Sequence, residues 1–223
     1  MRETKRRLAS FAFYDRSGIE EYLERQAQAG WMIESIDNLF WNFRRIEPKQ
    51  VHFCVVYCAK APVFGSGRSD AEMELADFCE HTGWKKAASC EKLQIFWNAS
   101  AAPVPLETDA VLSVSAIHST AKKSYLPADF LLTAASLAKL VITFSNGWPD
   151  SLPKVCTSVL WVLFFAYSLI DAVGYYGWYR RAKAAAALDG SFLETSAGWF
   201  RRLRLLVMVG VTALWACSLV LPV

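Results

Sequence analysis

The chain has 223 residues, of which 54% are hydrophobic and 20% are charged, and this composition excludes a disordered or fibrous protein. The net charge of +3, from 24 basic and 21 acidic residues, is too small and too mixed to indicate nucleic-acid binding by itself. Residues 1–100 hold 14 basic and 14 acidic side chains, whereas residues 101–223 hold 10 and 7 and contain the long apolar runs. We therefore expect a water-soluble N-terminal domain followed by a membrane domain.

The N-terminal segment is basic, but it is not typical of a secretory signal. Its apolar stretch, from Leu8 to Tyr14, has only seven residues and includes the polar Ser10. A signal peptide needs an uninterrupted apolar region. We therefore expect residues 1–100 to remain on the cytoplasmic side. Residues 7–14 are instead typical of a β-strand.

Two acidic segments have the pattern of amphipathic helices. In the first, residues 17–29, Ser17 can cap the helix and Glu20 lies three residues later, as in a capping box. The second covers residues 69–82. Each is followed by a Gly-Trp pair, and glycine is the usual residue in the left-handed position after a helix. We therefore predict two helices that stop at these glycines.

The two Gly-Trp pairs belong to an internal repeat. The repeated pieces are Gly30-Trp31 with Phe40-Trp41-Asn42, and Gly83-Trp84 with Phe96-Trp97-Asn98. Apolar alternation also predicts strands at 32–46 with a bend near 37–38, at 51–59 and at 87–97. The resulting order, β-α-β-β-α-β, predicts an α+β, ferredoxin-like domain over residues 1–100, with both helices on one face of an antiparallel sheet.

The other face of this predicted sheet must also be covered. Both alternating sides of the strand 51–59 carry apolar residues, so neither side is typical of a solvated sheet face. A second copy of the chain, the linker helix around residues 109–119 or the membrane surface could cover it, and we favour a homodimer or docking of the linker. The binding candidates in this domain are aromatic: Trp31, Trp41, Phe53, Trp84 and Trp97.

The sequence contains none of the common catalytic or nucleotide-binding motifs. Paired carboxylates such as Glu20 and Glu21 are expected on a solvated helix face. Cys79 and His81 have a ligand-like spacing, but no second pair is placed to complete a tetrahedral site. The strand 51–59 lacks the basic and glycine residues of an RNA-binding sheet. We therefore expect no catalytic residue, no metal, no cofactor and no nucleic-acid partner.

The apolar segments of the C-terminal half predict an all-α membrane domain. After a linker at residues 101–126, three apolar segments are long enough to span a bilayer, at about 127–147, 153–173 and 205–223. Most Lys and Arg residues of this half lie before the first segment or in the basic region 174–204, which we expect along the inner membrane surface. The positive-inside rule then predicts a cytoplasmic N-terminus and an external C-terminus.

Two charged residues fall inside the predicted spans, Lys139 in the first and Asp171 in the second. An ionisable group within a bilayer is costly and marks a functional position by default. In an antiparallel hairpin the depths of the two residues would differ by about 15 Å, so we do not expect them to pair. Both are membrane charge candidates for contact with a larger complex.

The first half also carries a set of short aromatic and acidic motifs. They are Phe11-x-Phe13-Tyr14-Asp15, Glu20-Glu21-Tyr22-Leu23 and Ala27-x-x-Gly30-Trp31, then Phe43, Pro48 and Val51-x-Phe53-x-Val55-x-Tyr57. Together, over about residues 5–100, they resemble the bacterial family known as domain of unknown function 2812. The resemblance implies a soluble domain followed by a few membrane spans, and genes that often accompany PadR-type transcription regulators. It implies no particular activity.

These features lead to two main hypotheses on function. We expect a non-enzymatic, multi-pass inner-membrane sensor or regulatory protein whose cytoplasmic domain binds a partner or effector. The alternative is an accessory subunit of a membrane transporter or channel complex, in which Lys139 and Asp171 contact the helices of a larger partner. A membrane enzyme is a third hypothesis, which the lack of a catalytic motif disfavours.

Overall fold

The computed structural model describes most of the chain. The described residues are 3–8, 11–37, 40–57, 77–90, 93–106, 109–193, 206–207, 209–211 and 213. The chain forms two compact units, one of Met1–Thr120 with Ala182–Ser196 and the other of Ala121–Arg181 with Ala197–Val223. The described strands all belong to the first unit.

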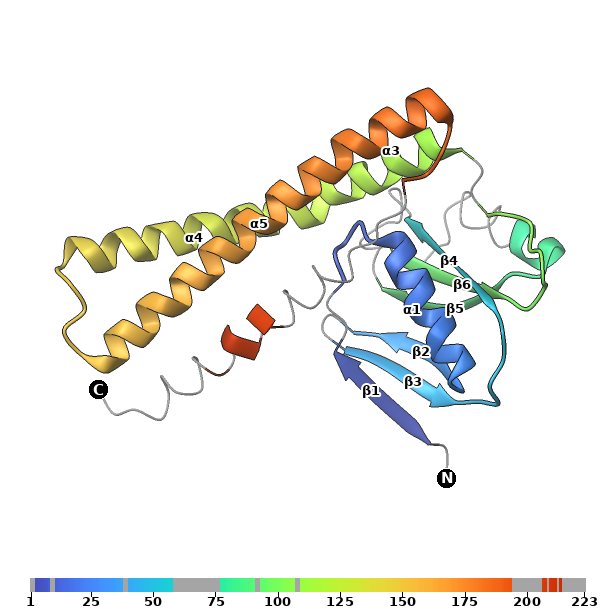
Figure 1. Cartoon of the computed structure of the whole chain (residues 1–223), viewed down its shortest axis with the longest axis horizontal. Helices are drawn as coiled ribbons and strands as arrows, with labels where there is room; N and C mark the ends of the chain where they lie inside the picture. Colours follow the sequence, from blue (N-terminus) through green and yellow to red (C-terminus); the bar gives the residue numbers. More distant parts are fainter. Residues whose placement is uncertain are drawn as a thin grey trace. The chain divides into compact units, whose positions relative to one another are not determined.

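The N-terminal domain begins with a β-α-β-β segment (Figure 1). Its elements are β1 (Thr4–Leu8), α1 (Arg16–Gln28), β2 (Trp31–Ile36) and β3 (Phe40–Arg45). The strands form an antiparallel sheet in the order β1-β3-β2. Helix α1 buries Leu23 and Ala27 completely and lies alongside β2.

A second β-α-β-β segment repeats this arrangement. Its elements are β4 (His52–Tyr57), a helical stretch at residues 77–82, β5 (Lys85–Cys90) and β6 (Leu93–Asn98). Its sheet is antiparallel in the order β4-β6-β5, the same relative order as in the first segment. β2 and β5 are neighbours, so the two sheets meet along equivalent strands. The predicted duplication is therefore confirmed in the fold.

The register of the two hairpins identifies the equivalent residues. Gly30 and Gly83 precede the hairpins, and both have a positive φ, +82° and +77°, that glycine adopts without strain. Phe43 and Phe96 each pair with the third residue after the respective glycine, and each hairpin has a bulge at the next position. Phe96 is thus equivalent to Phe43 and not to Phe40. The match between the two Phe-Trp-Asn tripeptides is therefore wrong by three residues.

The start of α1 differs from the prediction. Asp15, rather than Ser17, caps the helix, because its Oδ1 accepts a hydrogen bond from Gly18 N at 3.2 Å. Asp15 N in turn donates to Ala12 O at 2.9 Å. The chain is therefore turning where the sequence predicted the end of a strand, and β1 already ends at Leu8.

The strand order also differs. The predicted strands at 32–46 and 87–97 each contain a hairpin of two strands. The described part of the domain therefore has six strands in two β-α-β-β segments, and it does not adopt the predicted ferredoxin-like β-α-β-β-α-β order. Of the predicted helix 69–82, residues 77–82 are helical and the others lie outside the described residues. The mixed α and β content is as predicted.

A helix that follows the domain is docked on it. α3 (Ala110–Thr120) lies beside β4 and buries an apolar face that includes Ile117, which is 1% exposed. This arrangement matches the predicted docking of the linker, whereas the homodimer stays a prediction. Through η1 (Ala121–Tyr125), a π-helical segment, the chain continues into α4 (Leu126–Ser145) without leaving the helical conformation.

Among the described residues, two helices are long and apolar enough to cross a membrane. They are Ala110–Ser145, formed by α3, η1 and α4, and Lys154–Leu188, which is most of α5 (Leu152–Asp189). Figure 1 shows α4 and α5 side by side as an antiparallel hairpin. The third predicted span, 205–223, lies outside the described residues except for a few positions.

Helix α5 is longer than a bilayer is thick. Its 38 residues correspond to about 57 Å at 1.5 Å per residue, compared with about 30 Å of hydrocarbon. The basic region 174–204 is therefore, up to Asp189, the continuation of this helix. Its position along the inner membrane surface stays a prediction. Residues 194–204 lie outside the described part of the chain.

Candidate functional site

The five aromatic binding candidates fall into two groups. Trp41, Phe53 and Trp84 are buried, with exposed fractions of 5–6%. Trp31 and Trp97 are half-buried and reach the surface of the domain. The structure therefore leaves Trp31 and Trp97 available for binding and places the other three in the core.

The buried aromatic residues have contacts that explain their position. Trp41 stacks on Phe11 with a distance of 5.1 Å between the ring centroids. Trp84 packs in a cluster with Cys79, and its Nε1 donates a hydrogen bond to Val104 O at 2.8 Å. A buried indole N–H needs such an acceptor. These contacts give Trp41 and Trp84 a role in stability.

Trp31, the first residue of β2, is in contact with two cations. Lys5 Nζ lies 4.9 Å and Arg45 Cζ 5.0 Å from the centroid of its ring. Lys5 also donates to Gln26 Oε1 at 3.0 Å, and Arg45 donates to Ala29 O at 3.2 Å. Both cations are therefore anchored to the C-terminal end of α1.

Trp97, in β6, has a similar arrangement. Lys49 Nζ lies 4.0 Å and Lys85 Nζ 5.5 Å from the centroid of its ring. Lys85 is the cross-strand partner of Trp97 in the β5–β6 register, which explains why the two side chains meet. Cation–π contacts at exposed sites contribute only about 0.5–1 kcal/mol, so they orient these cations without neutralising them.

The segment 45–49 joins the two clusters, because it supplies Arg45 to one and Lys49 to the other. Ile46 N donates to Gly30 O at 3.0 Å, and Lys49 N donates to Ala27 O at 3.2 Å. These bonds hold the segment against the end of α1. We call the joined clusters the basic–aromatic surface, which consists of Lys5, Trp31, Arg45, Lys49, Lys85 and Trp97.

A different group of polar residues, on α1, covers the free edge of β4. Glu20 Oε1 accepts a hydrogen bond from Val55 N at 2.8 Å, and Glu24 Oε1 accepts one from Phe53 N at 3.4 Å. Arg16 Nε donates to Glu20 Oε1 at 3.0 Å. Free backbone donors on an edge strand would otherwise be open to pairing with another chain. The two carboxylates therefore close this edge of the sheet.

The sequence-based expectation for Glu20 is wrong. It placed Glu20 with Glu21 on a solvated face, but the Glu20 side chain is 22% exposed whereas that of Glu21 is 67% exposed. Burial raises the pKa of Glu20 above its ordinary value of 4.5, and it outweighs the opposing effects of Arg16 and of the Val55 N–H. The signal that was available is the spacing of Glu20 and Glu24, which puts them on one helix face.

Two pairs of polar side chains join η1 and α4 to α5. Thr133 Oγ1 and Ser168 Oγ are 2.6 Å apart, and Tyr125 OH donates to the carboxylate of Asp171. Asp171 is 5% exposed, so this membrane charge candidate lies inside the helix pair. Hydrogen bonds between helices in lipid contribute roughly 1 kcal/mol each. These contacts therefore help to hold the hairpin together.

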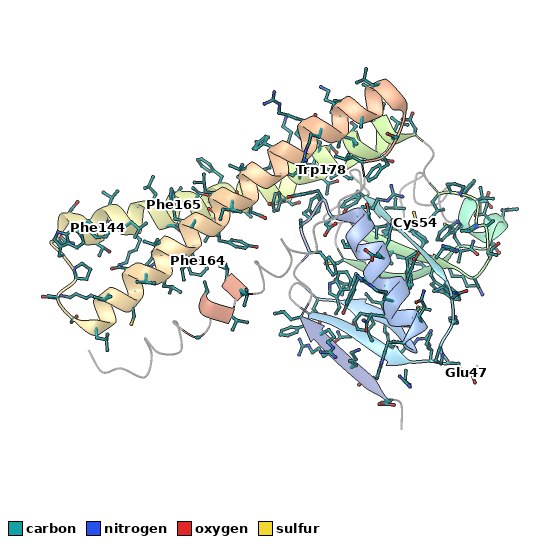
Figure 2. All side chains as sticks on the ribbon, viewed as in Figure 1. Glu47, Cys54, Phe144, Phe164, Phe165 and Trp178 are labelled. Carbon is teal, nitrogen blue, oxygen red and sulfur yellow. The ribbon has the colours of Figure 1, made fainter. Side chains whose placement is uncertain are left out.

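Lys139 and Asp171 do not pair in the structure, which agrees with the expectation from their different depths. Lys139 lies beyond Thr133 toward the loop of the hairpin, and Asp171 lies beyond Ser168 in the opposite direction, so they are about 14 Å apart along the helix axes. Lys139 is exposed on α4, close in sequence to the exposed apolar residues Leu137, Val141 and Ile142. Figure 2 shows the side chains along the hairpin, with Phe144 of α4 and Phe164 and Phe165 of α5 labelled.

Within the described ranges, no three His, Cys, Asp or Glu residues gather into a group that could hold a metal ion. A family model described as a protein of unknown function (DUF2812) matches residues 15–128, about half of the chain. The matched region extends from the cap of α1 to the start of α4, and it includes the docked helix α3. No curated protein and no solved structure matches the chain.

Proposed function

The chain belongs to the DUF2812 family of proteins of unknown function, and we propose that it is a membrane-anchored regulatory protein whose N-terminal domain binds a partner or effector. In this proposal the domain lies in the cytoplasm, and α4 and α5 lie in the inner membrane. Binding to the domain changes the state of the helices, or a change in the helices alters binding.

The observation that supports this proposal is the helix that connects the two units. α3 is docked beside β4, and the same helix continues through η1 into α4. A ligand that stabilises one packing arrangement of α3 on the domain therefore acts directly on a candidate membrane helix. π-helical segments such as η1 are rare and occur frequently at functional sites.

We expect the substitution Ile117→Asp to release α3 from the domain, because it puts a carboxylate at a position that is 1% exposed. Amide hydrogen exchange of the full chain in nanodiscs should then become faster in both α3 and β4. Cross-linking in native membranes should show a changed set of partners at the N-terminal domain. Leu112→Asp is the matched control, since it makes the same change on α3 at a position that is 67% exposed.

The proposal fails if Ile117→Asp speeds exchange in α3 and β4 while the cross-linked partners stay the same as in the wild type and in Leu112→Asp. It also fails if the full chain forms no cross-link to any protein or small effector in native membranes. Membrane insertion of both variants should be unchanged, and extraction by carbonate checks this.

An accessory role in a transporter or channel complex is the second candidate function, and the position of Lys139 favours it. Lys139 is exposed on α4 within an apolar stretch, where an ammonium group is costly in lipid. A polar group on a helix of a partner protein would remove that cost.

For this second function, we expect Lys139→Ala to abolish the high-mass complex of the protein, measured by native electrophoresis of membranes solubilised in mild detergent. Lys154→Ala is the control, because Lys154 already has a partner in Asp150, with 2.6 Å between Nζ and Oδ1. A complex of unchanged size in Lys139→Ala would rule out a role of Lys139 in assembly.

A further inference from the structure

The basic–aromatic surface carries positive charge that nearby carboxylates do not compensate. Among the described residues, none of its four cations has a carboxylate within salt-bridge distance. Other cations of the same domain do: Arg6 contacts Asp37 at 3.8 Å, and Arg25 contacts Glu21 at 3.3 Å. The surface is therefore a local concentration of positive charge on a domain of otherwise mixed charge.

Two cations of this surface, Lys5 and Arg45, are close enough to repel each other. The pKa of Lys5 is lowered, first by burial and then by the charges of Arg7 and Arg45. Lys86, the next residue of β5, is also exposed but lies on the opposite side of the strand from Lys85, and Glu47 is an exposed acid in the 45–49 segment. Like charges held together by backbone anchors and aromatic rings are suited to bind an anion.

We propose that the basic–aromatic surface binds the anionic headgroups of a phospholipid bilayer. The chain that carries it also has two helices long and apolar enough to cross a membrane, so a bilayer surface is always close to the domain. Lys and Arg residues near an anionic bilayer each strengthen binding about fivefold. This inference does not depend on the proposed regulatory role.

The contacts of the two tryptophans favour a lipid surface over a nucleic acid. Single-stranded nucleic acids are bound through bases that stack on aromatic rings. Here the rings of Trp31 and Trp97 already contact two cations each. The groups left for a ligand are therefore ammonium and guanidinium groups, which bind phosphate. Tryptophan beside such cations is also typical of a membrane interface.

The test uses the full chain in nanodiscs of phosphatidylcholine, with and without phosphatidylglycerol, and measures amide hydrogen exchange. We expect slower exchange at residues 44–49 and 85–86 when phosphatidylglycerol is present. About 1 M salt, at which charges are screened beyond about 3 Å, should reverse this protection. Equal exchange in the two kinds of nanodisc would overturn the inference.

Variants assign the effect to this surface. In the double variant Lys49→Gln/Lys85→Gln, the association of this surface with phosphatidylglycerol bilayers should be about 30-fold weaker, as expected for the loss of two cations. The protection from exchange should fall accordingly. Arg6→Gln/Arg25→Gln makes the same change in net charge at cations that have acidic partners, and it should respond as the wild type does. If the first pair alters exchange throughout the domain, Lys5→Gln/Arg45→Gln provides the same test at Trp31. An equal loss in the Arg6/Arg25 control would overturn the assignment.

Soluble anions distinguish a bilayer from other sources of phosphate. Inorganic phosphate and a single-stranded oligonucleotide are each added to the chain in phosphatidylcholine nanodiscs. We expect neither to protect residues 44–49. Protection by inorganic phosphate would indicate a site for a free anion, and protection by the oligonucleotide would indicate a nucleic-acid site; either result would overturn the inference.

Discussion

The substitution Trp84→Ala is expected to destabilise the N-terminal domain by about 3–5 kcal/mol. Trp84 is 6% exposed and packs in a cluster with Cys54, Cys79 and Phe96. Its removal leaves a cavity in that cluster and takes away the hydrogen-bond donor of Val104 O. The urea midpoint of the domain, measured by pulse proteolysis of the full chain in detergent, should fall accordingly.

The chain offers a matched control for this prediction. Trp31 follows Gly30 as Trp84 follows Gly83, so the two residues are equivalent in the repeat, but Trp31 is half-buried. We expect Trp31→Ala to cost about 1 kcal/mol or less. Equal costs for the two substitutions would contradict the distinction between a core and a surface tryptophan.

The second large effect is expected for Glu20→Ala. This substitution removes the acceptor of the Val55 N–H at the edge of β4 and the carboxylate that Arg16 contacts. Loss of one partner of a buried, charge-assisted hydrogen bond costs roughly 2–3 kcal/mol. The same measurement of the urea midpoint applies. Glu21→Ala, at a side chain that is 67% exposed, is the control and should change the midpoint little.

Glu20 should also contribute to the pH dependence of stability. Its pKa is raised in the folded domain, so the folded state binds this proton more tightly than the unfolded state. Its contribution is therefore fully present below the ordinary pKa of 4.5 and is lost as the pH rises through the folded pKa. Glu24, Arg16 and His52 are the nearby charged or titratable groups.

The substitution Glu20→Gln isolates this contribution, because glutamine keeps an oxygen that can accept from Val55 N but does not ionise in this range. The stability of the wild type minus that of Glu20→Gln should fall as the pH rises above 4.5. A difference that stays constant or rises with pH would show that burial does not raise this pKa.

Local patterns in the sequence predicted several elements of the N-terminal domain because short-range physics determines them. Gly30 and Gly83 end helices since the chain requires a positive φ there. The apolar strand at 51–59 corresponds to β4, and its two apolar faces led to the expectation that a second copy of the chain or the linker covers it. In the structure, α3 of the linker lies beside β4. The duplication was visible because the Gly-Trp pair recurs at the same point of each repeat.

The errors occurred where tertiary contacts decide the structure. Whether 32–46 forms one strand or a hairpin depends on pairing between β2 and β3, which apolar alternation does not show. Glu20 was expected in solvent because paired carboxylates ordinarily lie on a solvated helix face. Its burial follows from the edge of β4, which is distant in sequence. Similarly, the cations that contact Trp31 come from β1 and from the end of β3.

The docking of α3 has a practical consequence for dissecting this protein. A fragment that stops near residue 100, where the first domain was predicted to end, lacks the helix that lies beside β4. Such a truncation leaves β4 with apolar side chains open to water, and fragments of this kind self-associate. A fragment intended to keep β4 covered should therefore extend at least through α3, to Thr120, where the first stretch of this compact unit ends.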